Sequence, residues 1–107
     1  MDSDRKLFAM ANVENKCIIV SGGIKSDGFS AKALELVERY NIVTDSWETL
    51  PSLKRARQAH ASVSLGDTVY VFCGANSDSE PMCSVEYLLN ASGPIDQLDQ
   101  WQQIPIL

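Results

Sequence analysis

The sequence repeats itself with a spacing of about 50 residues, and this repetition constrains the fold more than any other feature. Arg5 and Arg57 are 52 positions apart, and a similar stretch of residues follows each of them. At the same spacing of 52, the segment 17–22 aligns with the segment 69–74. A period of this length is longer than that of most helical and leucine-rich repeats. We therefore expect two copies of one structural unit.

Further matches show where the two copies differ in length. The Val-Glu pair at 37–38 matches the pair at 85–86, a spacing of 48, and the segment 47–53 matches 101–107, a spacing of 54. The spacing changes between these segments, so insertions and deletions are expected to fall in loops. We expect this organisation: a single domain over residues 1–107, with a first repeat at 5–53 and a second repeat at 57–107.

Each copy is predicted to contain four short strands with turn residues between them. The strands are expected at 6–10, 17–21, 34–40 and 46–50 in the first copy, and at 59–64, 68–73, 83–88 and 100–104 in the second. The segment 33–40 taken alone would also suit a helix, because it is rich in helix-forming residues. Its counterpart 83–87 has no such preference. Since both copies should adopt one structure, we predict a strand.

A set of motifs recurs in the same order in both copies: glycine after the second strand, glutamate and tyrosine on the third, tryptophan on the fourth, and a Leu-Pro-like turn that precedes an arginine. The motif residues are Gly22, Gly23, Glu38, Tyr40, Trp47, Pro51 and Arg57 for the first copy, and Gly74, Glu86, Tyr87, Trp101 and Pro105 for the second. In this order the motifs resemble the kelch repeat over nearly the whole chain. The resemblance implies an all-β fold of two four-stranded antiparallel blades, an incomplete kelch-type β-propeller, because closed propellers typically have about 4–8 blades.

Several motif residues are expected to have structural roles. Glycines at 22, 23 and 74 let the backbone turn through positive φ where the second strand ends. By resemblance, Tyr40 belongs to the third strand, and Trp47 and Trp101 fill the wedge between neighbouring blades. The second copy has a single glycine after Cys73, so the alignment of the first copy's doublet is open by one residue.

The composition limits the partners and the compartment. The chain has 14 acidic and 9 basic side chains, a net charge of −5, which argues against binding to nucleic acid. Apolar runs such as 17–20 are too short to span a membrane, and residues 1–6 do not resemble a secretory signal. Three cysteines without paired spacing suit reduced thiols. We therefore expect a cytoplasmic protein with no nucleic-acid or membrane partner.

The sequence offers few residues for chemistry. His60 is the only histidine, and Cys17, Cys73 and Cys83 include no Cys-x-x-Cys pair. We therefore predict no catalytic residue, no metal site and no cofactor. His60 is expected to be a hydrogen-bonded structural residue. Cys17 and Cys73 are expected in buried strands, where thiols behave as small hydrophobic groups.

Alternate connections of an antiparallel meander lie on the same rim, so the loop after each second strand should share a rim with the link between the copies. By resemblance, kelch propellers bind partners on this rim, and loops on a rigid scaffold often carry binding residues. The candidate partner-binding residues are Lys25, Ser26, Arg55, Arg57, Asn76 and Ser77. Arg57 is the leading candidate, as a bidentate donor to an acidic peptide. The alternative is that Arg57 braces the backbone of the next blade.

The sequence favours a protein–protein interaction module, part of a larger propeller or assembly, over an enzyme. By resemblance, such scaffolds include ubiquitin-ligase adaptors and cytoskeletal binders, which usually need an additional domain. The alternatives are a fragment of a kelch-type enzyme, related to sugar epimerases or oxidases, and a structural filler in a complex. Copper oxidases of this kind need several tyrosine, cysteine and histidine ligands, which a single histidine does not supply.

Two blades leave two uncovered faces, because repeat units bury their apolar faces against neighbours. We expect these faces to be covered by further propeller blades or by self-association. Three origins remain open: part of a longer propeller, a subunit that completes a ring with other chains, or a degenerate product.

Overall fold

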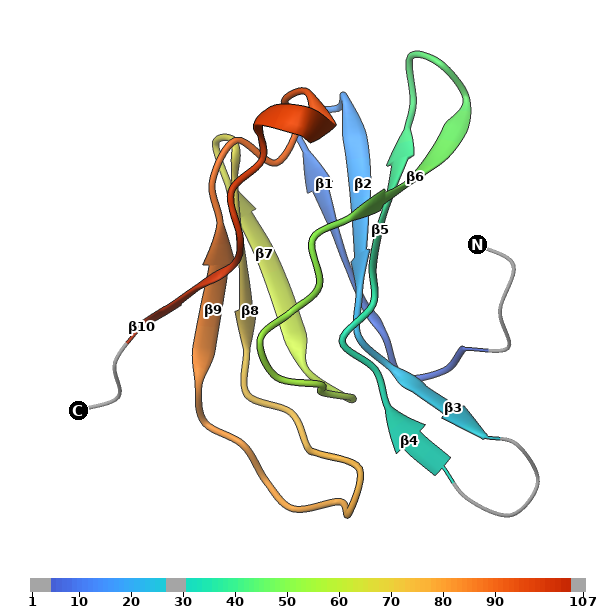
Figure 1. Ribbon diagram of the computed structural model, residues 1–107, viewed down its shortest axis with the longest axis vertical. Coiled ribbons are helices and arrows are strands. Elements are labelled where there is room, and N and C mark those ends of the chain that lie inside the picture. The colour runs from blue at the N-terminus through green and yellow to red at the C-terminus, as the bar shows by residue number, and fades with distance from the viewer. Residues whose placement is uncertain (1–4, 27–30, 105–107) are drawn as a thin grey trace.

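The computed structural model describes residues 5–26 and 31–104 (Figure 1). Across these residues the strands form two four-stranded antiparallel sheets and a two-stranded hairpin, with one 3-10 turn and no α-helix. The expected all-β class is therefore confirmed, and the segment 33–40 is not helical. None of the described segments is a helix that is long and apolar enough to cross a membrane.

Each four-stranded sheet is a simple meander, as expected for a propeller blade, and the two do not close into a ring. Blade 1 has the order β1-β2-β5-β6, with strands β1 (Ala9–Val13), β2 (Cys17–Ser21), β5 (Val37–Asn41) and β6 (Ser46–Leu50). Blade 2 has the order β10-β9-β8-β7, with strands β7 (Ala61–Leu65), β8 (Thr68–Phe72), β9 (Val85–Leu88) and β10 (Gln102–Ile104). The remaining elements are the hairpin β3 (Ile24–Ser26) and β4 (Ala31–Ala33), and the 3-10 turn η1 (Ile95–Gln97).

The first turn of each blade shifts the register between the two copies by one residue. Three residues, 14–16, join β1 to β2, whereas only Gly66 and Asp67 join β7 to β8. The spacing between equivalent residues is therefore 52 before this turn and 51 after it. The backbone shows the same shift, since Gly22 (φ 61°) and Gly23 (φ 104°) correspond to Cys73 (φ 56°) and Gly74 (φ 90°).

The alignment of 17–22 with 69–74 is therefore wrong by one residue. Successive strand residues point to opposite faces, so the correction exchanges the two faces of β8. Ile18, and not Cys17, is the counterpart of Val69. Cys73 takes the place of Gly22 at the end of the strand and is exposed, contrary to the expected burial, whereas Cys17 is buried as expected.

The core lies between the two blades, where the inner strands β1 and β7 are adjacent and the outer strands β6 and β10 diverge (Figure 1). Its buried side chains are Ala11, Val13, Cys17, Ile19, Val37, Leu50, Leu53, Val69, Val71, Leu88, Ala91 and Trp101. Trp101 is completely buried, and its indole Nε1 donates a hydrogen bond to the Pro51 carbonyl at 2.9 Å. Trp101 and Leu53 therefore fill the wedge between the blades.

Trp47 has no such place, although it stands in blade 1 where Trp101 stands in blade 2. Its side chain is 45% exposed and contacts Tyr40, with ring centroids 5.3 Å apart. Strand register puts Trp47, Tyr40 and Ile18 on the face of blade 1 that points away from blade 2. The expected burial in a wedge is thus correct for Trp101 and wrong for Trp47, because no sheet in the described residues covers that face.

Candidate functional site

The link between the blades, the β2–β5 connection and the β8–β9 loop lie at one end of the molecule, which we call the link rim (Figure 1). Isolated bridges join Leu34 to Arg57 and Gln58 to Ala75 across these segments. The opposite end, which carries the β1–β2 and β7–β8 turns and η1, is the turn rim. The binding rim inferred from the sequence is the link rim, and both blades contribute to it.

Glycines let the segments of the link rim cross at close range. All three, Gly22, Gly23 and Gly74, have positive φ. A Cβ atom on Gly22 would lie 2.5 Å from the Arg57 carbonyl oxygen, and one on Gly74 would overlap the Gln58 carbonyl. Gly23 also donates its N–H to the Arg57 carbonyl at 2.8 Å. Gly22 and Gly74 have no room for a side chain because the link passes directly over them, and Gly23 has none because Lys6 and Phe8 lie against it.

Arg57 is completely buried, so it is not available to a partner. Its Nη1 donates to the carbonyls of Cys73 (3.1 Å) and Ser84 (2.8 Å). Its Nη2 donates to Ser84 Oγ (3.0 Å) and to Glu86 Oε2 (2.8 Å). The prediction that Arg57 is a bidentate donor to an acidic peptide is therefore wrong. The guanidinium braces the backbone of blade 2, which was the alternative interpretation.

Arg5 repeats this arrangement in blade 1. Its Nε donates to the Gly22 carbonyl (2.8 Å), its Nη2 to the Leu36 carbonyl (2.6 Å) and its Nη1 to Glu38 Oε1 (2.6 Å). Burial lowers the pKa of the Arg5 guanidinium, and the Glu38 carboxylate opposes that shift. These Arg–Glu contacts were not predicted from the sequence. The signal was present, since the arginines repeat at a spacing of 52 and the glutamates at 48.

Glu86 connects this buried network to the surface of the link rim. Its carboxylate is completely buried and accepts hydrogen bonds from the backbone N–H groups of Lys54 (2.7 Å) and Arg55 (3.2 Å). The buried Glu86 carboxylate therefore holds the backbone of the link in place from inside the blade. The side chains of Lys54 and Arg55 are exposed above it.

The β3–β4 hairpin adds further cations. Lys25 and Ser26 lie on β3 and are exposed, and Lys25 stands directly opposite the exposed Lys32 of β4. Like charges directly opposite each other on two strands are destabilising. Residues 27–30, which the sequence also assigns to this rim, lie outside the described residues.

The two candidates in the β8–β9 loop shape the loop itself. Asn76 Oδ1 accepts hydrogen bonds from the N–H groups of Asp78 (2.9 Å) and Glu80 (3.0 Å). Ser77 Oγ accepts one from the N–H of Ala33 (2.9 Å), which docks the loop of blade 2 onto β4. Asn76 and Ser77 therefore hold the link rim together.

A groove of about 450 Å³ opens on the link rim between the β3–β4 hairpin and the link. It is lined by Lys32, Ala33, Leu34, Glu35, Leu36, Ser52 and Ala56. Most of its lining is apolar, and Lys32 and Glu35 supply the charges. Lys25 is next to it on the hairpin, and Lys54 and Arg55 are next to it on the link.

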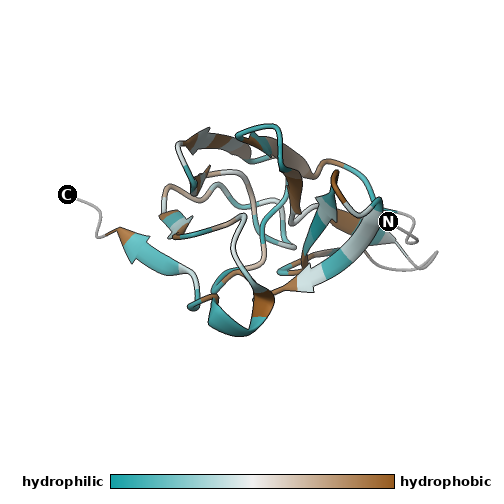
Figure 2. Ribbon diagram, turned by 90° about the horizontal axis from the view of Figure 1, so that it is seen from above, coloured by the Kyte–Doolittle hydropathy of each residue, from teal (hydrophilic) through white to brown (hydrophobic). Residues whose placement is uncertain are grey.

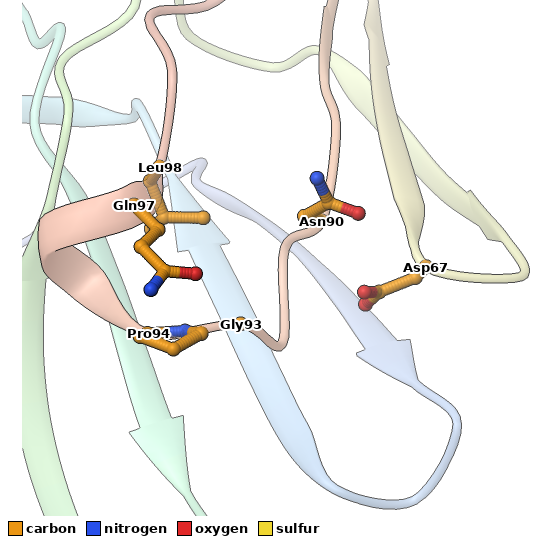
Figure 3. Close-up of a pocket in the computed structure, with 6 residues that line it drawn as sticks. All are labelled: Asp67, Asn90, Gly93, Pro94, Gln97 and Leu98. Atoms are coloured by element: carbon orange, nitrogen blue, oxygen red, sulfur yellow. The ribbon is translucent and has the colours of Figure 1, made fainter.

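A second hollow, of about 320 Å³, lies on the turn rim beside η1 (Figure 3). Its lining residues are Asp67, Asn90, Gly93, Pro94, Gln97 and Leu98. Asp67 Oδ1 accepts a hydrogen bond from the N–H of Ser92 at 2.9 Å. The single acid in this hollow thus secures the loop around it, which leaves the link rim as the stronger candidate.

His60 is buried next to Gly22 and Gly74. It is hydrogen-bonded, with 3.0 Å between its Nε2 and Ser21 Oγ. Burial lowers the His60 pKa to about 4, and the positive charges of Arg57 and Arg5 act in the same direction. The imidazole is therefore neutral at pH 7. The described residues contain no group of three or more His, Cys, Asp or Glu placed to hold a metal ion.

Two twisted meanders, packed inner strand to inner strand with a tryptophan in the wedge, define adjacent blades of an open β-propeller. Residues 4–54 match the family model of the Kelch motif, a match that covers blade 1 and reaches the link. Blade 2 repeats the buried Arg–Glu pair, the positive-φ turn and the tryptophan of blade 1. Residues 4–54 therefore carry a kelch motif, and the two blades together are similar to the kelch-repeat family. Kelch repeats generally serve as protein-interaction modules.

Proposed function

We propose that the chain binds an acidic segment of a partner protein on its link rim. The observation that carries this proposal is the charge distribution. Although the chain has a net charge of −5, four exposed cations lie on the segments that form or adjoin the rim groove. These cations are Lys25, Lys32, Lys54 and Arg55. An anionic segment would relieve the repulsion between the opposed Lys25 and Lys32.

The rim is also held in shape before a partner arrives. The buried Glu86 carboxylate fixes the backbone beneath Lys54 and Arg55, and Ser77 ties the β8–β9 loop to β4. A site that is already ordered loses less conformational entropy on binding. Arg57 contributes indirectly, because it pairs with Glu86 inside the blade.

The groove favours a particular kind of acidic segment. Its walls include Ala33, Leu34 and Ala56, so an apolar side chain next to the acidic residues would fit there. The β8–β9 loop carries the exposed acids Asp78 and Glu80. These acids, and Glu35 in the groove lining, would repel the same ligand, so the acidic part should lie over the β3–β4 hairpin and over Lys54 and Arg55 of the link.

Peptide selection tests this proposal directly. We expect a random display library panned against the chain to yield peptides that combine Asp or Glu with an apolar residue. Lys54→Glu should weaken their binding by about tenfold or more, since it reverses a charge beside the groove. Titrations with labelled peptides, repeated from 0.05 to 0.3 M salt, should show weaker binding as salt increases.

Lys16→Glu is the matched control. Lys16 is exposed in the β1–β2 turn, so this substitution makes the same charge change on the turn rim. It should leave the affinity of the selected peptides within about twofold of that of the unmodified chain. Equal losses of affinity in the two variants would show that only the net charge matters and would overturn the proposed site. A selection that yields no acidic peptides would also overturn it.

A further inference from the structure

Blade 1 carries an open apolar face on the side away from blade 2. We call it the Trp47 face, and it surrounds a hollow of about 300 Å³ lined by Met10, Ile18, Val20, Tyr40 and Trp47. Met10 is 54% exposed and Trp47 45%. The Trp47 indole N–H donates to no acceptor among the described residues, unlike that of Trp101.

Blade 2 carries a second open apolar face on its own far side, which we call the Tyr70 face. Strand register places the side chains of Val63, Tyr70 and Tyr87 in one row across β7, β8 and β9. The Tyr70 ring lies 5.9 Å from that of Tyr87 and 6.3 Å from that of Phe72, centroid to centroid. The exposed apolar residues of this face are Val63, Leu65 and Ile104. In the view from above, β10, the strand next to the C-terminus, lies at the outer edge of the molecule (Figure 2), and it pairs with β9.

These two faces match the two sides of the interface that the chain forms within itself. In that buried interface, blade 2 presents Val69, Val71, Leu88 and Trp101. Their counterparts in blade 1 are Ile18, Val20, Tyr40 and Trp47, which form the Trp47 face. Blade 1 presents Ala11, Val13, Ile19 and Leu50 to the same interface. Their counterparts in blade 2 are Val63, Leu65, Tyr70 and Ile104, which lie on the Tyr70 face.

We propose that the Trp47 face is covered by the Tyr70 face of a second copy of this chain. The contact would repeat, between two molecules, the packing of blade 2 on blade 1 within one molecule. Such a head-to-tail contact uses two different surfaces, so each copy can bind one neighbour on each side until a ring closes. Propellers close with about 4–8 blades, which corresponds to about two to four copies.

Measurement of mass in solution provides the first test. Sedimentation equilibrium of the chain should show mass that increases with concentration toward a closed multiple of the 11.8 kDa monomer. Trp47→Glu and Tyr70→Glu each place a carboxylate in one of the two faces. Each variant should weaken assembly by about 30-fold or more, as expected for a central aromatic of an interface.

A mixture of the two variants distinguishes a head-to-tail contact from other contacts. The Trp47→Glu chain keeps an intact Tyr70 face, and the Tyr70→Glu chain keeps an intact Trp47 face. We therefore expect the mixture to form a 1:1 dimer that does not grow further, although each variant alone is a monomer. Val43→Glu is the matched control, because Val43 is 82% exposed in the β5–β6 turn, outside both faces, and this variant should assemble normally.

Near-ultraviolet circular dichroism and the emission of the buried Trp101 show whether each variant is folded. A folded chain that stays monomeric at every concentration would overturn the proposal and leave these faces to blades of another polypeptide. So would assembly that survives both substitutions, or folded variants that do not pair when mixed. These substitutions leave Lys25 and Lys54 in place, so peptide binding on the link rim is measured independently.

Discussion

Two buried arginines connect the sequence repeat to the geometry of the blades. Arg5 and Arg57 each tie the end of the second strand to the start of the third strand, and each pairs with a buried or nearly buried glutamate. An isolated buried charge is costly, so these ion pairs are stable only because both partners are enclosed together. In the sequence, Arg57 resembles a binding residue because a strand pattern does not show whether a side chain of the link points into a blade or into solvent.

His60 makes the stability of the chain depend on pH. Its pKa is about 4 in the folded chain, below the usual value of about 6.5 for an unfolded chain. Between these values the unfolded state binds more protons, so the free energy of unfolding decreases as pH falls from about 6.5 to 4. Above pH 6.5 the effect is absent. The free energies of unfolding measured with urea at pH 7 and at pH 4.5 should differ by on the order of 2–3 kcal/mol because of His60 alone.

His60→Gln isolates this contribution, because glutamine can keep a hydrogen bond to Ser21 but does not titrate. Carboxylates also titrate in this pH range, and their contribution should be common to both proteins. The variant should therefore lose less stability on acidification than the unmodified chain. An identical pH dependence in the two proteins would show that His60 does not titrate as described.

At the scale of elements, the length of a single turn decides which face each side chain occupies. The β7–β8 turn is one residue shorter than the β1–β2 turn, which changes the repeat spacing from 52 to 51. Sequence similarity favoured a constant spacing because both second strands are apolar on both faces. Hydrogen bonds resolve the ambiguity, since the N–H of Gly22 donates to Leu36 and that of Cys73 to Ser84.

Gly74→Ala is expected to destabilise blade 2 strongly. Gly74 has a φ of 90°, and an added Cβ would overlap the Gln58 carbonyl, which is held by its pairing with Ala75. We expect a loss of about 3 kcal/mol or more in urea unfolding. Gly66→Ala is the control, because Gly66 has a φ of 59° with open space around it. That change should cost only about 1–2 kcal/mol. Similar losses in both variants would contradict the close approach of Gly74 to the Gln58 carbonyl.

The β3–β4 hairpin shows the limit of pattern reading at this scale. The strands at 17–21 and 46–50 were predicted with the observed bounds, and the other six blade strands with ends displaced by up to three residues. The hairpin itself was not predicted. Its strands are only three residues long and mostly exposed, so they have no apolar alternation to detect. The hairpin forms where the connection extends beyond Gly23, with Ile24 paired to Lys6.

For the whole molecule, the two tryptophans should contribute very differently to stability. Trp101→Ala removes a completely buried side chain from the wedge and should cost about 3–5 kcal/mol. Trp47→Ala should cost no more than about 2 kcal/mol at concentrations where the chain is monomeric, because its indole is 45% exposed. Urea unfolding of both variants measures the difference. Equal losses at low concentration would mean that the Trp47 face is already covered.

The sequence by itself determined the repeat, the all-β class, the four strands of each blade and the rim shared by the link and the two loops. These features are local or periodic, so short-range patterns encode them. Only the tertiary structure decided that Arg57 is enclosed, that Cys73 is exposed and that Trp101 is covered while Trp47 is not. Burial depends on what packs against a residue from elsewhere in the chain, and two copies of one motif can have different neighbours.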